Sequence, residues 1–230
     1  MLSELNTVLI VAPHADDETL GCGGSIARFV AEGRTVVVAL MTGAGAAPHP
    51  LFQADTLDGI RAEFDAAMAV LGVKRTVFGG LPSTLLTGMP VHEVNRAAQT
   101  IVAEVKPNLV LLPFEHDLHR DHGLLNYAFR VAMRSHLPAN RKPHAVLCYE
   151  TPTETHLQHP HAQGGFEPNL WIDISGHIDR KLEALACYAS QMAPLPSLRG
   201  PGASDALATW RGAQIGVRAA EAFSIVRQVV

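Results

Sequence analysis

Short apolar runs alternate with longer amphipathic segments along most of the chain. The first three runs are apolar almost without interruption, which is typical of strands that are covered on both faces. Two later runs are shorter but have the same β-rich composition. We therefore expect strands at residues 7–12, 35–42, 108–114, 145–150 and 170–174.

The segments between these runs have helical periodicity. In one of them Ile60, Phe64, Met68 and Leu71 recur every three or four residues, as one buried helix face requires. Alternation of strand and helix predicts right-handed βαβ crossovers. The expected fold is one α/β domain over residues 1–230, Rossmann-like, with a mostly parallel sheet and helices on both faces. The helices are expected at residues 25–33, 57–72, 91–106 and 123–136, and long loops at 43–55 and 152–168.

The composition narrows the functional class. Apolar residues make up 47% and charged residues 17% of the 230 residues, which is typical of a globular protein. The net charge of −4 shows no basic surplus, so no nucleic-acid partner is expected. No apolar run is long enough for a membrane span, and the N-terminus lacks a leader pattern, so a cytoplasmic location is expected. Three widely spaced cysteines without a Cys-x-x-Cys pair do not suggest a thiolate metal site.

Candidate chemistry follows the first expected strand, in "LIVAPHADDETLGCGG" (9–24). His14, Asp16 and Asp17 come directly after the apolar run. Adjacent carboxylates repel each other, and a bound cation would offset that repulsion. Ligands of parallel α/β sheets bind beyond the carboxyl ends of the strands, where this cluster is expected to lie.

A second polar cluster follows the strand expected at 108–114. It contains His116, Asp117, His119, Asp121 and His122. A catalytic zinc ion takes three ligands from histidine and carboxylate side chains and keeps one position open for water. His14, Asp17 and His122 would form such a set.

Asp16 and Asp121, which are not in this ligand set, would then have other roles. Asp16 would be free to take a proton from the water, and Asp121 could hold the ring of His119 in one tautomer. Each cluster by itself could also be a solvated loop with a helix N-cap. Both follow core strands of one sheet, however, so both are expected at one crevice.

The pair "PHADDETLGCGG" and "HRDH" resembles the PIG-L/LmbE superfamily of metal-dependent N-deacetylases, which have a Rossmann-like fold. That family acts on compounds that contain N-acetylglucosamine. "RAEFDAAMAVLGV" is similar to the family's second helix, and "YASQ" (188–191) and "AEAF" (220–223) resemble its C-terminal signatures. The resemblance covers most of the chain.

The resemblance implies a role for each matching residue. The metal ligands would again be His14, Asp17 and His122, with Asp16 as general base. His119 would contact the oxyanion or protonate the leaving amine, and Asp121 would orient His119.

Three positions depart from the family pattern. Ala15 and Arg120 stand where proline is usual, and neither change removes a ligand. Asp117 stands where some members have a tyrosine, so the oxyanion contact of that tyrosine is not expected here.

The expected function is a zinc-dependent hydrolase that removes the N-acetyl group from an N-acetylglucosamine-type sugar or conjugate. The ligand types also suit Fe²⁺. The expected partner is a small N-acetylated amino sugar, with Arg61 and Asp117 as candidate contacts, although the favoured interpretation of Arg61 is an exposed or ion-paired helix residue. The Ala-rich helices would tolerate a homo-oligomer.

Three alternatives remain open. An amidase of the same family could cleave a non-sugar or thiol-conjugate N-acyl amine. A non-haem iron oxygenase could use a His14-x-Asp16…His122 triad. A nucleotide-binding module could use the glycines at 21, 23 and 24, although the G-x-G-x-x-G spacing is lacking.

Overall fold

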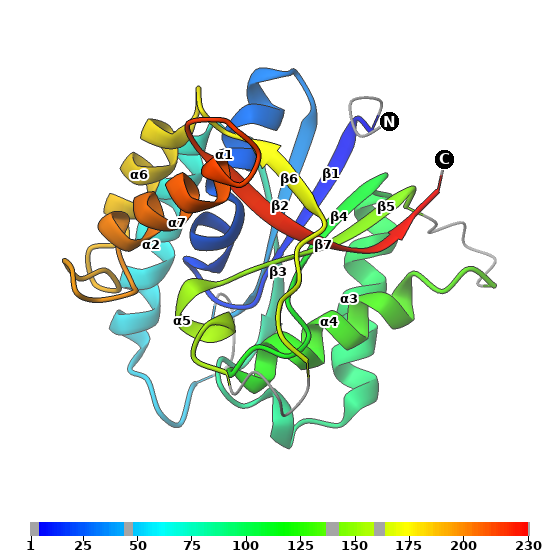
Figure 1. The fold of residues 1–230 in the computed structure, drawn as a ribbon. Coiled ribbons are helices and arrows are strands. Elements are labelled where there is room, and N and C mark those ends of the chain that lie inside the picture. The colour runs from blue at the N-terminus through cyan, green and yellow to red at the C-terminus, as the bar shows by residue number, and fades with distance from the viewer. Residues whose placement is uncertain (1–4, 44–47, 137–142, 159–163, 230) are drawn as a thin grey trace.

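The computed structural model describes residues 5–43, 48–136, 143–158 and 164–229. Its centre is a seven-stranded sheet in the order β3-β2-β1-β4-β5-β7-β6 (Figure 1). The first five strands in sequence run parallel, and β7 pairs antiparallel with both β5 and β6. The strands are β1 (Thr7–Ala12), β2 (Thr35–Thr42), β3 (Arg75–Leu81), β4 (Leu109–Pro113), β5 (Ala145–Tyr149), β6 (Leu170–Asp173) and β7 (Ala220–Gln228).

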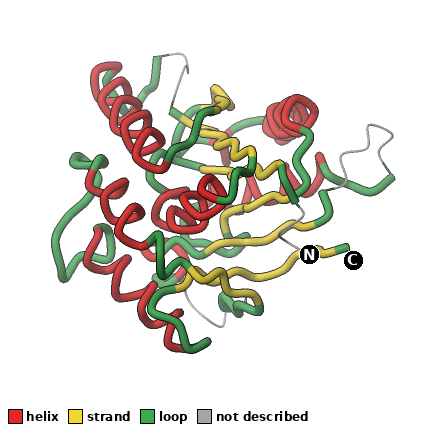
Figure 2. The backbone as a smooth tube through the Cα atoms, turned by 90° about the horizontal axis from the view of Figure 1, so that it is seen from above, coloured by secondary structure: helices red, strands yellow, loops and turns green. Residues whose placement is uncertain are grey.

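Helices cover both faces of the sheet, as Figure 2 shows from above. They are α1 (Asp17–Ala31), α2 (Ala54–Leu71), α3 (Val91–Val105), α4 (Arg120–Ala132), α5 (Pro152–Thr155), α6 (Ile178–Ala186) and α7 (Pro201–Ala213). On one face α1, α2, α6 and α7 bury residues such as Phe29 and Phe64 against alternate strand positions. On the other face α3 and α4 pack against the intervening positions, with Val102 and Phe129 in the core. Within the described part of the chain, no helix is long and apolar enough to cross a membrane.

The structure confirms the expected fold class and all five expected strands, with ends that differ by at most one residue. Two strands were missed. β3 contains two glycines and is a half-exposed edge strand, and β7 mixes apolar residues with Glu221 and Arg227. The helices α6 and α7 were also missed, and α1 begins eight residues before the expected start. Residues 44–47 and 159–163 of the two expected loops lie outside the described residues, whereas α2 begins within the first loop and α5 lies within the second.

The glycines of α1 allow the helix to lie close to the sheet. A Cβ on Gly21 would lie 2.2 Å from Cδ2 of Tyr149, and one on Gly24 would lie 2.5 Å from Cδ1 of Ile174. Both glycines are buried. This packing explains the glycine-rich segment without a phosphate ligand, which weighs against the nucleotide-binding alternative.

Gly21→Ala should lower the free energy of unfolding by about 2–3 kcal/mol, because the added methyl group overpacks the core. Tyr149 has no room to move, since it is fully buried and its hydroxyl donates to the Val11 carbonyl oxygen at 2.7 Å. The matched control is Gly59→Ala within α2, where a Cβ meets no atom within 4 Å. It should stabilise the protein by about 1 kcal/mol. Denaturant titration distinguishes the two, and equal stability of Gly21→Ala and wild type would contradict this account of the segment.

Candidate active site and metal centre

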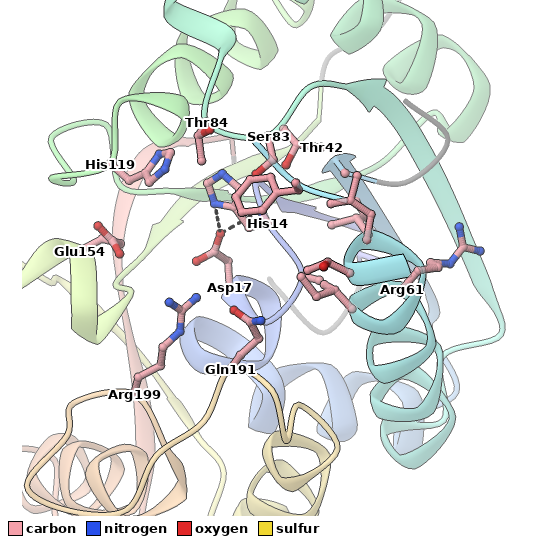
Figure 3. A pocket seen from close by; sticks show the side chains of 17 residues that line it. His14, Asp17, Thr42, Arg61, Ser83, Thr84, His119, Glu154, Gln191 and Arg199 are labelled. Atoms are coloured by element: carbon pink, nitrogen blue, oxygen red, sulfur yellow. Dashed lines mark hydrogen bonds and ion pairs between the residues drawn. The ribbon is translucent and has the colours of Figure 1, made fainter. Parts of the chain in front are cut away.

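Both polar clusters lie where the strand order of the sheet reverses. β1 and β4 are neighbours and run parallel, so their carboxyl ends open on the same crevice. The chain leaves β1 into His14–Asp17 and leaves β4 into the turn before α4. His14 and His119 therefore lie together with Asp17, although they are distant in sequence (Figure 3).

Three expected ligands come together as a compact group. The Oδ2 atom of Asp17 is 3.2 Å from Nδ1 of His14 and 3.2 Å from Nε2 of His122. Tetrahedral zinc with bonds of about 2.0–2.1 Å separates its ligand atoms by roughly 3.3 Å, so this spacing fits zinc. Nε2 of His122 is buried without a hydrogen-bond partner. Its contact within the described residues is the ion pair with Asp17 at 3.2 Å, and a metal ion between the two atoms would satisfy both of them.

His119 stands beside this group. Ligand atoms of His14, His119 and His122 all lie within 4.8 Å of one another, so the three imidazoles alone could also hold a metal ion. We favour Asp17 over His119 as the third ligand because the distances from Asp17 to both rings are shorter. Nδ1 of His119 accepts a hydrogen bond from the Asp121 amide at 3.2 Å, which leaves its Nε2 atom to carry the proton.

The rings of His14 and His122 each contact a second carboxylate through the nitrogen that does not face Asp17. Oδ2 of Asp121 is 3.3 Å from Nε2 of His14, and Oδ2 of Asp117 is 2.8 Å from Nδ1 of His122. Each ring is thereby oriented so that its other nitrogen faces Asp17. This carboxylate–histidine arrangement is typical of metal sites.

These contacts revise two of the expected roles. The Asp121 carboxylate was expected to orient His119, but it faces His14 and accepts from the Thr84 amide at 2.8 Å; only its backbone N–H reaches His119. Asp117 was expected to contact substrate. Its side chain is fully buried behind His122, where the Thr155 hydroxyl donates to it at 2.5 Å, and it does not line the cavity.

The carboxylate of Asp16 contacts Arg199 and not the imidazoles that Asp17 contacts. Oδ2 of Asp16 accepts from Nε and Nη2 of Arg199 at 3.0 and 2.8 Å, whereas Oδ1 is buried without a partner. Asp16 also has a left-handed backbone, with φ of 111°, which is strained for a residue other than glycine. The two adjacent carboxylates thus have different partners.

Burial and neighbouring charges shift the pKa values of these groups in opposite directions. Burial and the Asp17 charge raise the pKa of Asp16 to about 7, against the opposing effect of Arg199. Burial also acts on Asp17, but His122 and His14 outweigh it and hold the pKa of Asp17 well below its usual range. Burial and the His14 ring lower the pKa of His119. The adjacent carboxylates are therefore electrostatically distinct, as a ligand and a base would have to be.

A cavity of about 280 Å³ opens beside the histidines. Glu154, Gln191 and Arg199 contribute polar groups to one side (Figure 3). Apolar side chains on the α2 side include Leu40, Phe52, Leu57 and Ile60.

Arg61 also borders the cavity, but its guanidinium group points away from it (Figure 3). That group is bound to Asp65 at 3.0 Å and lies over the ring of Phe78 at 3.7 Å. In this structure Arg61 is therefore an ion-paired helix residue and not a contact for a ligand in the cavity. Sequence reasoning did not single out Arg199, Gln191 or Glu154 as site residues, because they lie on irregular or short segments without periodicity.

A second buried network explains the two C-terminal signatures. The hydroxyl of Tyr188 donates to Glu18 at 2.5 Å, next to the candidate metal ligand Asp17. α1 is kinked at Cys22 (φ −146°), and the carboxylate of Glu221 accepts from the amides of Gly24 and Ser25 at 2.9 and 2.7 Å. Lys181 is bound to Glu221 at 2.6 Å. The segments that contain Tyr188 and Glu221 thus hold α1 in place.

Comparison with known proteins agrees with this geometry. The family model "PIG-L: GlcNAc-PI de-N-acetylase" matches residues 9–133. A probable N-acetyl-alpha-D-glucosaminyl L-malate deacetylase 2 of Bacillus cereus is 30% identical over 80% of this chain and 83% of its own length.

Solved structures show the same fold. N,N'-diacetylchitobiose deacetylase from Pyrococcus horikoshii superposes with a TM-score of 0.76 at 23% identity, covering 98% of this chain and 85% of its own. The 4-carboxy-2-hydroxymuconate hydratase of Pseudomonas putida does so with a TM-score of 0.75 at 21% identity, covering 98% of each chain. Because proteins named for different reactions have this fold, the assignment depends on the site residues and the family match. From both, the chain belongs to the PIG-L family of de-N-acetylases.

Proposed function

We propose that this protein is a zinc-dependent hydrolase that removes the N-acetyl group from an N-acetylglucosamine-type sugar or sugar conjugate. The observation that carries the proposal is the convergence of His14, Asp17 and His122, with Nε2 of His122 buried and making no hydrogen bond. Membership of a de-N-acetylase family and the name of the Bacillus cereus relative support the same reaction.

The metal would be held by Nδ1 of His14, Oδ2 of Asp17 and Nε2 of His122. When bound, zinc polarises an amide carbonyl and lowers the pKa of the attacking water. Histidine and carboxylate ligands also suit Fe²⁺. Asp121 and Asp117 keep the two rings oriented for this task.

The chain's own residues would move the protons. As the water oxygen attacks the acetyl carbon, the free Oδ1 atom of Asp16 accepts its proton. The Nε2–H group of His119 donates a hydrogen bond to the developing oxyanion. When the C–N bond breaks, Asp16 delivers the proton that it took from the water to the amine, and acetate and the free amine leave.

The shape of the cavity bears on the substrate. Polar side chains on one side suit sugar hydroxyls, and the apolar side chains near α2 suit an uncharged group. The apolar side also favours the second candidate, an amidase of the same family that acts on a non-sugar N-acyl amine. The substrate would in either case be a small molecule. Three free cysteines agree with a reducing, cytoplasmic location.

The iron-oxygenase alternative fits less well. Its triad requires the carboxylate of Asp16 beside His14 and His122. That carboxylate is instead bound to Arg199, and Asp17 occupies the position between the rings.

Purified protein supplied with zinc should release acetate from at least one N-acetylglucosaminyl conjugate. Asp16→Asn should lower kcat by about 10²–10⁴-fold, because general base catalysis contributes that much. An acetate-release assay over a panel of free, glycosidic and carboxylate-bearing N-acetylglucosamine compounds measures both. Release from non-sugar N-acetyl amines alone would favour the amidase instead.

His122→Ala should abolish stable metal binding while the fold survives. Elemental mass spectrometry of protein purified without oxygen should find about one zinc or iron ion per wild-type chain and none in the variant, with unchanged circular dichroism. Wild-type protein that stays metal-free after reconstitution would overturn the ligand set.

Asp117→Asn should weaken zinc binding by about 10–100-fold, because the His122 ring loses its carboxylate partner. Competition with a chromophoric chelator measures the affinity. The control is Asp65→Asn, an exposed carboxylate that is ion-paired with Arg61 on α2; its zinc affinity should equal that of wild type. Equal affinities for all three proteins would mean that Asp117 has only a structural role.

A further inference from the structure

One contact in the site connects parts of the chain that are far apart in sequence. Arg199, between α6 and α7, donates through Nε and Nη2 to a single oxygen of Asp16, at 3.0 and 2.8 Å. The two residues are separated by 183 positions. The Asp16 side chain is fully buried, whereas that of Arg199 is 37% exposed and borders the cavity. The guanidinium group thus connects the cavity wall, where Figure 3 shows Arg199, with the buried carboxylate of Asp16.

The segment around Arg199 has a fixed backbone. The carbonyl oxygen of Arg199 accepts from the amide of Ala193 at 2.8 Å, and its own amide donates to the Ser197 hydroxyl at 3.1 Å. The next residue must be small, since a Cβ on Gly200 would lie 2.2 Å from the Ala193 carbonyl oxygen. A closed turn of this kind presents the arginine from a defined position.

The contact leaves the two oxygens of Asp16 in different environments. Oδ2 receives both donors from Arg199, and Oδ1 is buried without a partner. Asp16 itself has a strained left-handed backbone. An unheld carboxylate could rotate about its Cβ–Cγ bond and exchange the two oxygens. Two donors on one oxygen oppose that rotation.

The surrounding charges also make Arg199 the partner of Asp16. Asp16, Asp17 and Glu18 are consecutive acidic residues, all of them buried. Asp17 is paired with two imidazoles, and Glu18 with the hydroxyls of Thr19 and Tyr188. For Asp16, the ion pair in the described part of the chain is with Arg199.

We propose that Arg199 is a positioning residue for the general base. It holds Oδ2 of Asp16 so that the free Oδ1 faces the attacking water. The inference rests on the proposed function, in which Asp16 takes the proton from that water. It adds a residue from the C-terminal third of the chain to the catalytic apparatus.

The test compares Arg199→Ala and Arg199→Lys with the control Arg218→Ala, whose exposed side chain lies 3.5 Å from Asp179. Arg199→Ala should lower kcat on the order of 100-fold and leave KM within about twofold. Arg199→Lys should recover part of the loss, since lysine supplies the charge without the two-donor fork. Metal content should be unchanged in all three variants.

Guanidinium ions at millimolar concentration should restore activity to Arg199→Ala, and urea at the same concentration should not. A purely structural role for Arg199 would not produce this specific rescue. A rise in KM with an unchanged kcat would instead make Arg199 a substrate anchor and would overturn the proposal.

A double-mutant cycle supplies a readout that does not depend on activity. Arg199→Ala should raise the equilibrium constant for unfolding about tenfold in the wild-type background, because it leaves a buried carboxylate unpaired. In the Asp16→Asn background the same change should have an effect of less than about twofold. Equal effects in both backgrounds would mean that the two side chains are not coupled.

The two hypotheses fail in different ways. If the wild type is active and Asp16→Asn is not, a normal kcat for Arg199→Ala overturns the positioning role alone. If the wild type releases no acetate from any compound of the panel, the proposed function fails, and the catalytic part of this inference fails with it.

Discussion

Burial of three consecutive acidic side chains at the start of α1 is the constraint on which the rest of the structure depends. Charged carboxylates are costly to remove from water unless each has a partner. Asp16, Asp17 and Glu18 obtain theirs from Arg199, the two imidazoles and Tyr188, respectively. The N-terminal end of α1 adds a favourable dipole. Most of these partners come from distant segments, so the acidic run determines which parts of the chain must meet.

The site divides into residues that would hold the metal and residues that hold those ligands. The reversal of strand order between β1 and β4 brings His14 and His122 to one crevice, and each ring has its own carboxylate behind it. The geometry of the centre thus depends on contacts that do not reach the cavity. The cavity depends less on these contacts, since most of its walls come from irregular segments and from one face of α2.

The sequence was informative where a residue's environment is set locally. Continuous apolar runs identified the central strands, and two polar clusters directly after strands identified the groups that meet in the crevice. It was uninformative about Asp117 and Asp121, because whether a carboxylate faces substrate or stands behind a ring depends on side-chain direction within one turn. β3 escaped detection because glycine and exposed positions obscure its alternation. Arg199 gave no signal, since its contact spans 183 positions.

The kink in α1 has a consequence for how the protein is made. The helix breaks at Cys22, and the amides freed there are bound by Glu221, which lies on the last strand. The first helix after β1 therefore cannot reach its final form until β7 is available. During synthesis on the ribosome, β1 and the residues that follow it emerge early but must wait for β7. A chain truncated before β7 would lack both this strand and the contact that completes its first helix.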